Sequence, residues 1–90
     1  MIYKSKIGEL DLSTITRLYP AVIVDSDGEV AEMSLEWADL YGTKVKIVSY
    51  ILVFDYTPLK EEVKNRKVIE CDTRDELVEV MNEVAQFFQD

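Results

Sequence analysis

The residues best placed to do chemistry are a carboxylate and a phenol at the end of the most apolar stretch of the chain. Asp55 and Tyr56 close this stretch, and ligand sites often lie at strand ends in open sheets. Arg17, Tyr19 and Tyr50 are the polar residues that we expect to lie near them. Together, Arg17, Tyr19, Asp55 and Tyr56 form a candidate pocket. The alternative is that Asp55, beside the Thr57-Pro58 turn, is purely structural.

Histidine is absent from the chain, which removes the most common general base and the most common metal ligand. Cys71 lies between Glu70 and Asp72, whose negative charges would raise the pKa of its thiol and oppose nucleophilic activation. We therefore interpret Cys71 as a small buried strand residue. The sequence favours a non-enzymatic protein, with a small enzyme or small-molecule-binding domain around Asp55 and Tyr56 as the alternative.

Acidic residues dominate the charge of the chain, which has a formal net charge of -8. Phosphate-binding proteins carry basic patches, so this excess argues against direct binding to nucleic acid or to anionic membranes. A run without lysine or arginine is a candidate surface for a basic protein partner. Its members are Asp25, Asp27, Glu29, Glu32, Glu36 and Asp39. The alternatives are an ordinary solvated face and an acidic mimic of nucleic acid.

Asp25, Asp27 and Gly28 resemble the beginning of a calcium-binding loop. Such a loop needs a third oxygen-bearing side chain before the glycine and a bidentate glutamate six residues after it. The spacing here omits the third ligand, so we interpret this segment as a hairpin turn. We expect no metal and no cofactor.

Composition is that of one ordinary globular domain covering residues 1–90, with 48% hydrophobic and 31% charged residues. The first residues lack the apolar segment of a secretory signal, and no stretch approaches the roughly 20 apolar residues that span a bilayer. The single cysteine excludes an internal disulfide. These features predict a cytoplasmic protein without membrane contact.

The stretch Lys44–Tyr56 is the element around which the fold is organised. Its β-branched and aromatic residues favour a strand. Both alternating faces are mostly apolar, which is typical of a strand covered on both sides.

Other elements follow from local signals. Residues 1–10 alternate weakly and predict one strand near a sheet edge, bent at Gly8. For residues 11–20 a short helical turn from Ser13 to Leu18 is slightly favoured over an extended segment. The Asp27-Gly28 pair predicts a hairpin between strands at residues 21–24 and 29–33.

Three helices and a last strand are expected after this hairpin. Ser34 and Gly42 bound a short helix over residues 34–41. Thr57-Pro58 begins a second short helix, in which Glu62 pairs with Arg66. A strand over residues 68–71 precedes the C-terminal helix.

The C-terminal helix has the strongest signal. Thr73 and Glu76 match a capping box. At 100° per residue, half of the cylinder is apolar, and we expect its buried members to be Leu77, Met81, Val84 and Phe88.

These elements predict an α+β fold, namely a mostly antiparallel sheet of four to five strands with a long C-terminal helix packed on one face and one or two short helices. A single helix layer leaves the second apolar face of the central strand uncovered. We therefore expect a homodimer that acts as an interaction or regulatory module. The alternative is a monomer in which the helix at residues 34–41 covers that face.

Overall fold

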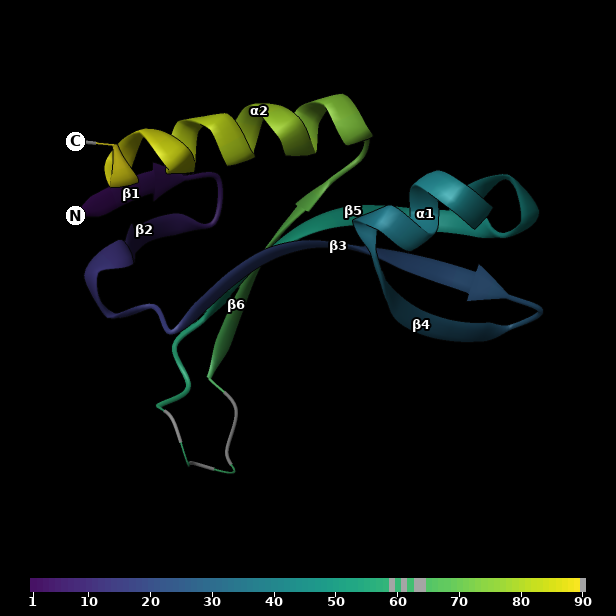
Figure 1. Ribbon diagram of the computed structural model, residues 1–90, viewed down its shortest axis with the longest axis horizontal. Coiled ribbons are helices and arrows are strands. Elements are labelled where there is room, and N and C mark those ends of the chain that lie inside the picture. Colours follow the sequence, from purple (N-terminus) through teal and green to yellow (C-terminus); the bar gives the residue numbers. More distant parts are fainter. Residues whose placement is uncertain (59, 61, 63–64, 90) are drawn as a thin grey trace.

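The computed structural model describes residues 1–58, 60, 62 and 65–89. It has an α+β fold with a four-stranded antiparallel sheet, a separate two-stranded sheet and two α-helices (Figure 1). The elements are β1 (Ile2–Ser5), β2 (Gly8–Asp11), β3 (Arg17–Ser26), β4 (Glu29–Ser34), α1 (Leu35–Tyr41), β5 (Lys46–Asp55), β6 (Arg66–Cys71) and α2 (Arg74–Ala85). Short 3-10 turns occupy Leu12–Thr14, Gly42–Lys44 and Gln86–Phe88.

The centre of the large sheet is a ribbon made of β3 and β5, each 10 residues long. The strand order is β4-β3-β5-β6, so the predicted central strand does lie inside the sheet. The register between β3 and β5 shifts between Ile23 and Val24, where Val48 of β5 is left without a partner. Such a bulge bends and twists the ribbon.

The predicted hairpin and the short helix after it are both confirmed. Asp27 and Gly28 take positive φ angles of 52° and 88°, and the backbone N–H of Gly28 donates to Asp25 Oδ1 at 2.9 Å. Glycine suits this position because it has no Cβ to clash. The Ser34 hydroxyl accepts from the Trp37 N–H at 3.1 Å and caps α1.

The prediction of a single strand over residues 1–10 is wrong. Residues 6 and 7 form a turn, and β1 pairs with β2 in a hairpin of its own. Gly8 has a φ of 111°, and the Ser5 hydroxyl closes the turn by donating to the Gly8 carbonyl at 2.8 Å. The glycine therefore reverses the chain instead of bending one strand.

The helical turn expected from Ser13 to Leu18 is also wrong in its bounds. Asp11 is the cap, since its Oδ1 accepts from the Ser13 N–H at 2.9 Å, and the turn ends at Thr14. The chain is extended again from Arg17 onward. The β-branched residues before Arg17 favour this early return to an extended backbone.

The helix predicted after Thr57-Pro58 depends largely on residues 59, 61, 63 and 64, which lie outside the described residues. Arg66, which was expected in this helix, is the first residue of β6 instead. The Thr57 hydroxyl accepts from the Asn65 N–H at 2.7 Å, and the Tyr56 N–H donates to the Asn65 carbonyl at 2.7 Å. These bonds draw the two sides of the loop together and let β6 start two residues earlier than predicted.

The cap of α2 is confirmed. The Thr73 hydroxyl accepts from the Glu76 N–H at 3.1 Å, and the Glu76 carboxylate accepts from the Asp72 N–H at 3.1 Å. Of the expected core residues, Leu77 and Val84 are buried, Met81 is half-buried and Phe88 is 49% exposed. Phe88 is exposed because the α-helix ends at Ala85 and the tighter 3-10 turn redirects the chain.

The two halves of the large sheet share one topology. Each half is a long inner strand, an outer strand and a helix, in the order β3-β4-α1 and then β5-β6-α2. The sequence gives no sign of this repetition, because the turn is two residues long in the first half and the connection is ten residues long in the second.

All the covering elements that the structure describes lie on one face of the large sheet. Leu52 and Phe54 of β5 belong to a buried cluster with Leu77 and Val84 of α2 and with residues of the β1–β2 hairpin. On the same face, Val22 and Val24 of β3 pack with Ala38 of α1. In Figure 1 both helices lie on the same side of the ribbon. The alternative, in which α1 covers the second face, is therefore wrong.

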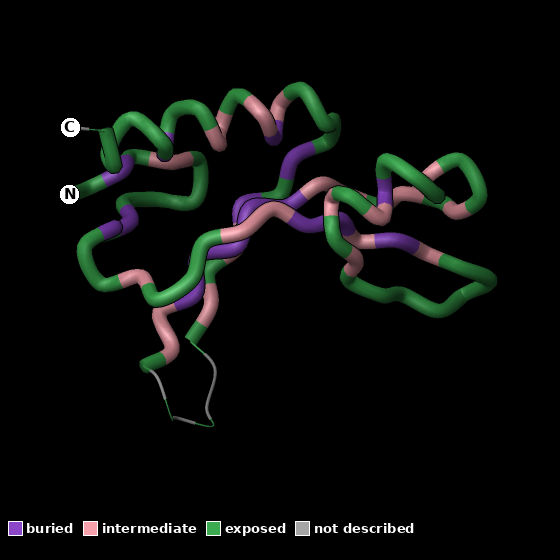
Figure 2. Tube along the Cα trace, in the orientation of Figure 1, coloured by how far each residue is buried: buried purple, intermediate pink, exposed green. Residues whose placement is uncertain are grey.

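The opposite side, which we call the helix-free face, carries Tyr19, Ala21, Ile23, Ile51, Val53 and Val68. Its centre is nevertheless dry, since Ala21 and Ile51 are 2% exposed and Val53 is 0% exposed. The second half of β5, residues 51–55, is thus buried on both sides (Figure 2), whereas the first half, which was also predicted to be covered, is partly or fully exposed.

Tyr3 joins the two ends of the chain. Its hydroxyl donates to Glu83 Oε2 at 2.6 Å, and its ring meets the Phe87 ring edge-on at 5.9 Å. Burial, followed by the hydrogen bond and charge of Glu83, raises the pKa of Tyr3 from 10.0 to about 12.

This pKa shift predicts a pH-dependent loss of stability. Because the folded pKa is higher than the unfolded one, the contribution is complete below about pH 10 and is lost as the pH rises to about 12. We expect wild type to lose roughly 2 kcal/mol more than Tyr3→Phe across this window. Urea unfolding of both proteins at pH 9 and at higher pH measures the difference. Parallel pH curves for the two proteins would contradict it.

Candidate functional site

Three charged residues form a row across the helix-free face where β3 and β5 meet the β5–β6 connection. Asp55 is the register partner of Arg17 on β3 and of Arg66 on β6. The Asp55 side chain is held by the Thr57 N–H, which donates to Oδ1 at 2.9 Å. Hydrogen bonding from Thr57, assisted by the charges of Arg17 and Arg66, lowers the pKa of Asp55. This carboxylate is therefore a fixed negative charge at neutral pH.

Tyr19 lies beneath both arginines. The guanidinium carbon of Arg17 is 5.0 Å from the centre of the Tyr19 ring, and that of Arg66 is 5.8 Å away. Guanidinium groups at such distances are attracted to the electron-rich face of an aromatic ring. The ring and the two cations together cover one end of the apolar centre of the helix-free face.

An ion pair between Arg66 of β6 and Glu32 of β4 completes the side-chain cover over the helix-free face. Arg66 Nη2 lies 2.8 Å from Glu32 Oε1, although β6 and β4 are opposite edges of the sheet. In a flat sheet these strands would be about 14 Å apart. Their side chains meet because the ribbon twists and coils. We call Arg66, Tyr19 and Glu32 the clasp, and it explains how Ala21, Ile51 and Val53 stay dry without a helix above them.

The structure brings together three of the four residues of the candidate pocket, namely Arg17, Tyr19 and Asp55. Tyr56 is separated from them because successive strand residues point to opposite faces. It packs against the covered core, where burial raises its pKa and its hydroxyl has no hydrogen-bond partner among the described residues.

Arg66 and Glu32 are members of this site that sequence reasoning did not place there. Glu32 was assigned to the acidic partner surface and Arg66 to a helix. Arg66, Val68 and Glu70 are spaced two residues apart, as are side chains on one face of a strand. This spacing is the sequence signal that could have assigned Arg66 to β6. A hollow of about 310 Å³ adjoins the site, with Arg17, Tyr19, Ala21 and Glu32 in its wall.

The arrangement is suited to holding charge and not to transferring protons. Asp55 is locked by a backbone donor, and Glu32 is occupied by Arg66. A general base must be free to accept a proton from a substrate, and neither carboxylate is free in this way. The predicted small-molecule pocket stays a prediction.

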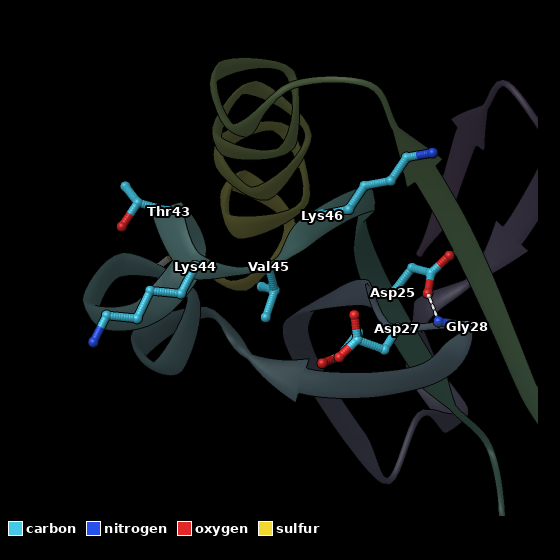
Figure 3. Close-up of a pocket in the computed structure, with 8 residues that line it drawn as sticks. Asp25, Asp27, Gly28, Thr43, Lys44, Val45 and Lys46 are labelled. Carbon is cyan, nitrogen blue, oxygen red and sulfur yellow. Dashed lines mark hydrogen bonds between the residues drawn. The ribbon is translucent and has the colours of Figure 1, made fainter.

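The acidic run does not form one surface. Glu32 pairs with Arg66, and Asp39 pairs with Arg74 at 3.1 Å. Asp25 is held within the hairpin turn. Asp25 and Asp27 line a hollow of about 520 Å³ with Thr43, Lys44 and Lys46, and in Figure 3 the Lys44 side chain points away from both aspartates. Glu29 follows the turn on β4, and Glu36 lies in the first turn of α1. A basic partner for these residues stays a prediction.

Cys71 is a buried strand residue, as predicted. Burial raises the pKa of its thiol; Lys6 acts in the opposite direction, and the charges of Glu76 and Asp72 raise it further. The described residues contain no group of three or more Cys, Asp or Glu side chains that could hold a metal ion. Among the helices within the described ranges, none is long and apolar enough to cross a membrane.

No protein-family model matches the chain, and no curated protein or solved structure does so either. Function must therefore be argued from the geometry of this molecule alone.

Proposed function

We propose that the protein is a non-enzymatic interaction module that pairs with a second copy of itself through the helix-free face. The observation that carries this proposal is the one-sided covering of the sheet. Both helices and the β1–β2 hairpin pack on the same side, and on the other side the described residues provide only side chains as cover. Sheet faces of this kind pack against one another at a spacing of about 10 Å.

Apolar groups remain available around the dry centre. Ile23 and Val68 are half-buried, and Val30 of β4 is 67% exposed. A second copy would remove this rim from water, and each fully buried aliphatic side chain stabilises an interface by about 1.5–3 kcal/mol before ordering costs.

Charge also favours this face over others. A chain with a net charge of -8 repels its own copies, but the basic and acidic side chains on the helix-free face nearly balance. They are Arg17, Lys46 and Arg66 against Asp25, Glu32, Asp55 and Glu70. Arg17, Arg66 and Asp55 lie at one end of the strands, where Glu32 reaches Arg66, and Asp25, Lys46 and Glu70 lie toward the other. Because each end holds charges of both signs, two such faces can pair without strong repulsion.

Sedimentation equilibrium over a wide range of concentration tests the proposal. We expect a species of twice the 10.4 kDa chain mass for wild type. Val68→Lys places a charge on the helix-free face and should shift the protein to monomer. Leu40→Lys, at a 73% exposed position on α1, is the matched control and should leave the dimer intact. A single 10.4 kDa species for wild type at high concentration would refute the proposal.

A further inference from the structure

One segment of β3 has an open backbone edge. β4 pairs with β3 only from Ala21 to Ser26, because the chain leaves the sheet at Ser34 to enter α1. Within the described part of the chain, no strand pairs with Arg17–Pro20 on that side. No strand therefore fills the position beside these four residues that a longer β4 would occupy.

Hollows lie on both sides of this edge. On the covered face, Leu18, Pro20, Leu52, Met81 and Val84 line an apolar groove of about 220 Å³. Leu18 also borders a second hollow of about 250 Å³, with Phe88 in its wall. On the helix-free face, the hollow of about 310 Å³ beside Arg17 and Tyr19 adjoins the same edge.

The covered face and the helix-free face differ in charge beside this edge. The apolar groove has no charged residue in its wall. On the other side, Glu32 is already paired with Arg66, whereas none of the described carboxylates lies within ion-pair distance of Arg17. An alternating strand laid along this edge would thus meet apolar surface on one face and an available cation on the other.

We propose that Arg17–Pro20 is a docking edge for an extended segment of another protein, which adds a short strand to the sheet. Backbone hydrogen bonds give such strand addition its affinity, and pockets for alternate side chains give it specificity. The segment that fits has two aliphatic side chains flanking one carboxylate. The aliphatic groups enter the groove at Leu18, Met81 and Val84, and the carboxylate meets Arg17.

The topology supplies an internal comparison. β6 pairs with β5 only as far as Tyr50, so Lys46–Ser49 is open in the same way. The apolar groove lined by Leu18, Met81 and Val84 lies beside Arg17–Pro20 and includes no residue of Lys46–Ser49, so we expect no strand to dock there. Pro20 lacks an N–H, so it donates no backbone hydrogen bond to the docked strand.

The test uses the full chain and the peptide acetyl-Thr-Val-Glu-Val-Thr-amide as probe. We expect shifts of the amide NMR signals of Arg17–Tyr19 on titration, and slower exchange of those amides in this segment that point to the open edge and not toward β5. The analogue with lysine in place of glutamate should bind roughly fivefold more weakly. Arg17→Glu should reverse the preference between the two peptides, and this reversal does not depend on absolute affinity.

Leu18→Glu, at a 37% exposed position, should abolish binding of the peptide, whereas Val48→Glu, at a 54% exposed position on the other open edge, should not. No binding at saturating peptide, or shifts confined to Lys46–Ser49, would overturn the proposal. Loss of self-association in Leu18→Glu would also overturn it, since a second copy would then be the occupant. Dimerisation through the helix-free face is tested separately by Val68→Lys, so the two proposals fail independently.

Discussion

Replacement of Phe54 with alanine is expected to lower the free energy of unfolding by about 3–5 kcal/mol. Phe54 is fully buried on the covered face, among Leu10, Ile69 and Leu77. Its removal leaves a cavity bordered by three separate elements that cannot all move inward. Because small domains are stable by only about 5–15 kcal/mol, the variant should be close to unfolded at 37 °C. Urea unfolding measures this loss of free energy. An m value equal to that of wild type would show that only stability has changed.

Val53→Ala is the matched comparison, since Val53 is the next residue of the same strand and points to the opposite face. It is also fully buried, and we expect a loss of about 2 kcal/mol from the smaller number of carbon atoms removed. A Val53→Ala variant as stable as wild type would mean that the helix-free face is wet in solution. The clasp would then not shield the centre of the sheet.

Removal of the Arg66 side chain should lower the free energy of unfolding by about 2 kcal/mol. The expected loss exceeds that of an ordinary surface ion pair, about 0–1 kcal/mol, because Arg66 also covers Tyr19 and the apolar centre with its aliphatic stem. Arg66→Ala removes both effects, and Arg66→Met restores only the apolar cover. We therefore expect Arg66→Met to recover part of the loss in urea unfolding.

Arg74 provides the control for this prediction. Its pair with Asp39 has a similar length, 3.1 Å against 2.8 Å, but joins two helices across open surface, with side chains that are 48% and 51% exposed. Arg74→Ala should change stability by no more than about 0.5 kcal/mol. Equal losses for Arg66→Ala and Arg74→Ala would show that the clasp is an ordinary surface pair. A double-mutant cycle of Arg66→Met with Glu32→Gln isolates the ionic part.

Elements with strong local signals were predictable from the sequence. The β-branched run of β5, the Asp27-Gly28 turn, and the hydroxyl caps at Ser34 and Thr73 each act within a few residues, and the structure contains the elements that they predict. The N-terminal region was not predictable in the same way. Gly8 is compatible with a bend or with a reversal, and only its pairing partners decide between them.

The candidate site was likewise predictable from the sequence only in part. Arg17, Tyr19 and Asp55 come together because neighbouring strands place alternate residues on one face. Tyr56 packs against the covered core instead, and the alternation rule alone would have separated it from Asp55. The meeting of Arg66 with Glu32 depends on the twist of the whole ribbon, which follows from backbone geometry and a bulge at Val48. No pattern of residue types encodes that diagonal contact.

The β1–β2 hairpin has a consequence for the order in which the molecule is built. Its buried residues, Tyr3, Leu10 and Leu12, find their partners on β5, β6 and α2, and the Tyr3–Glu83 bond spans 80 positions of the chain. A ribosome releases the hairpin before β5, β6 and α2, and the surface that receives it is complete only when α2 has emerged. The hairpin must therefore wait, with its apolar side chains in water, until α2 has been made.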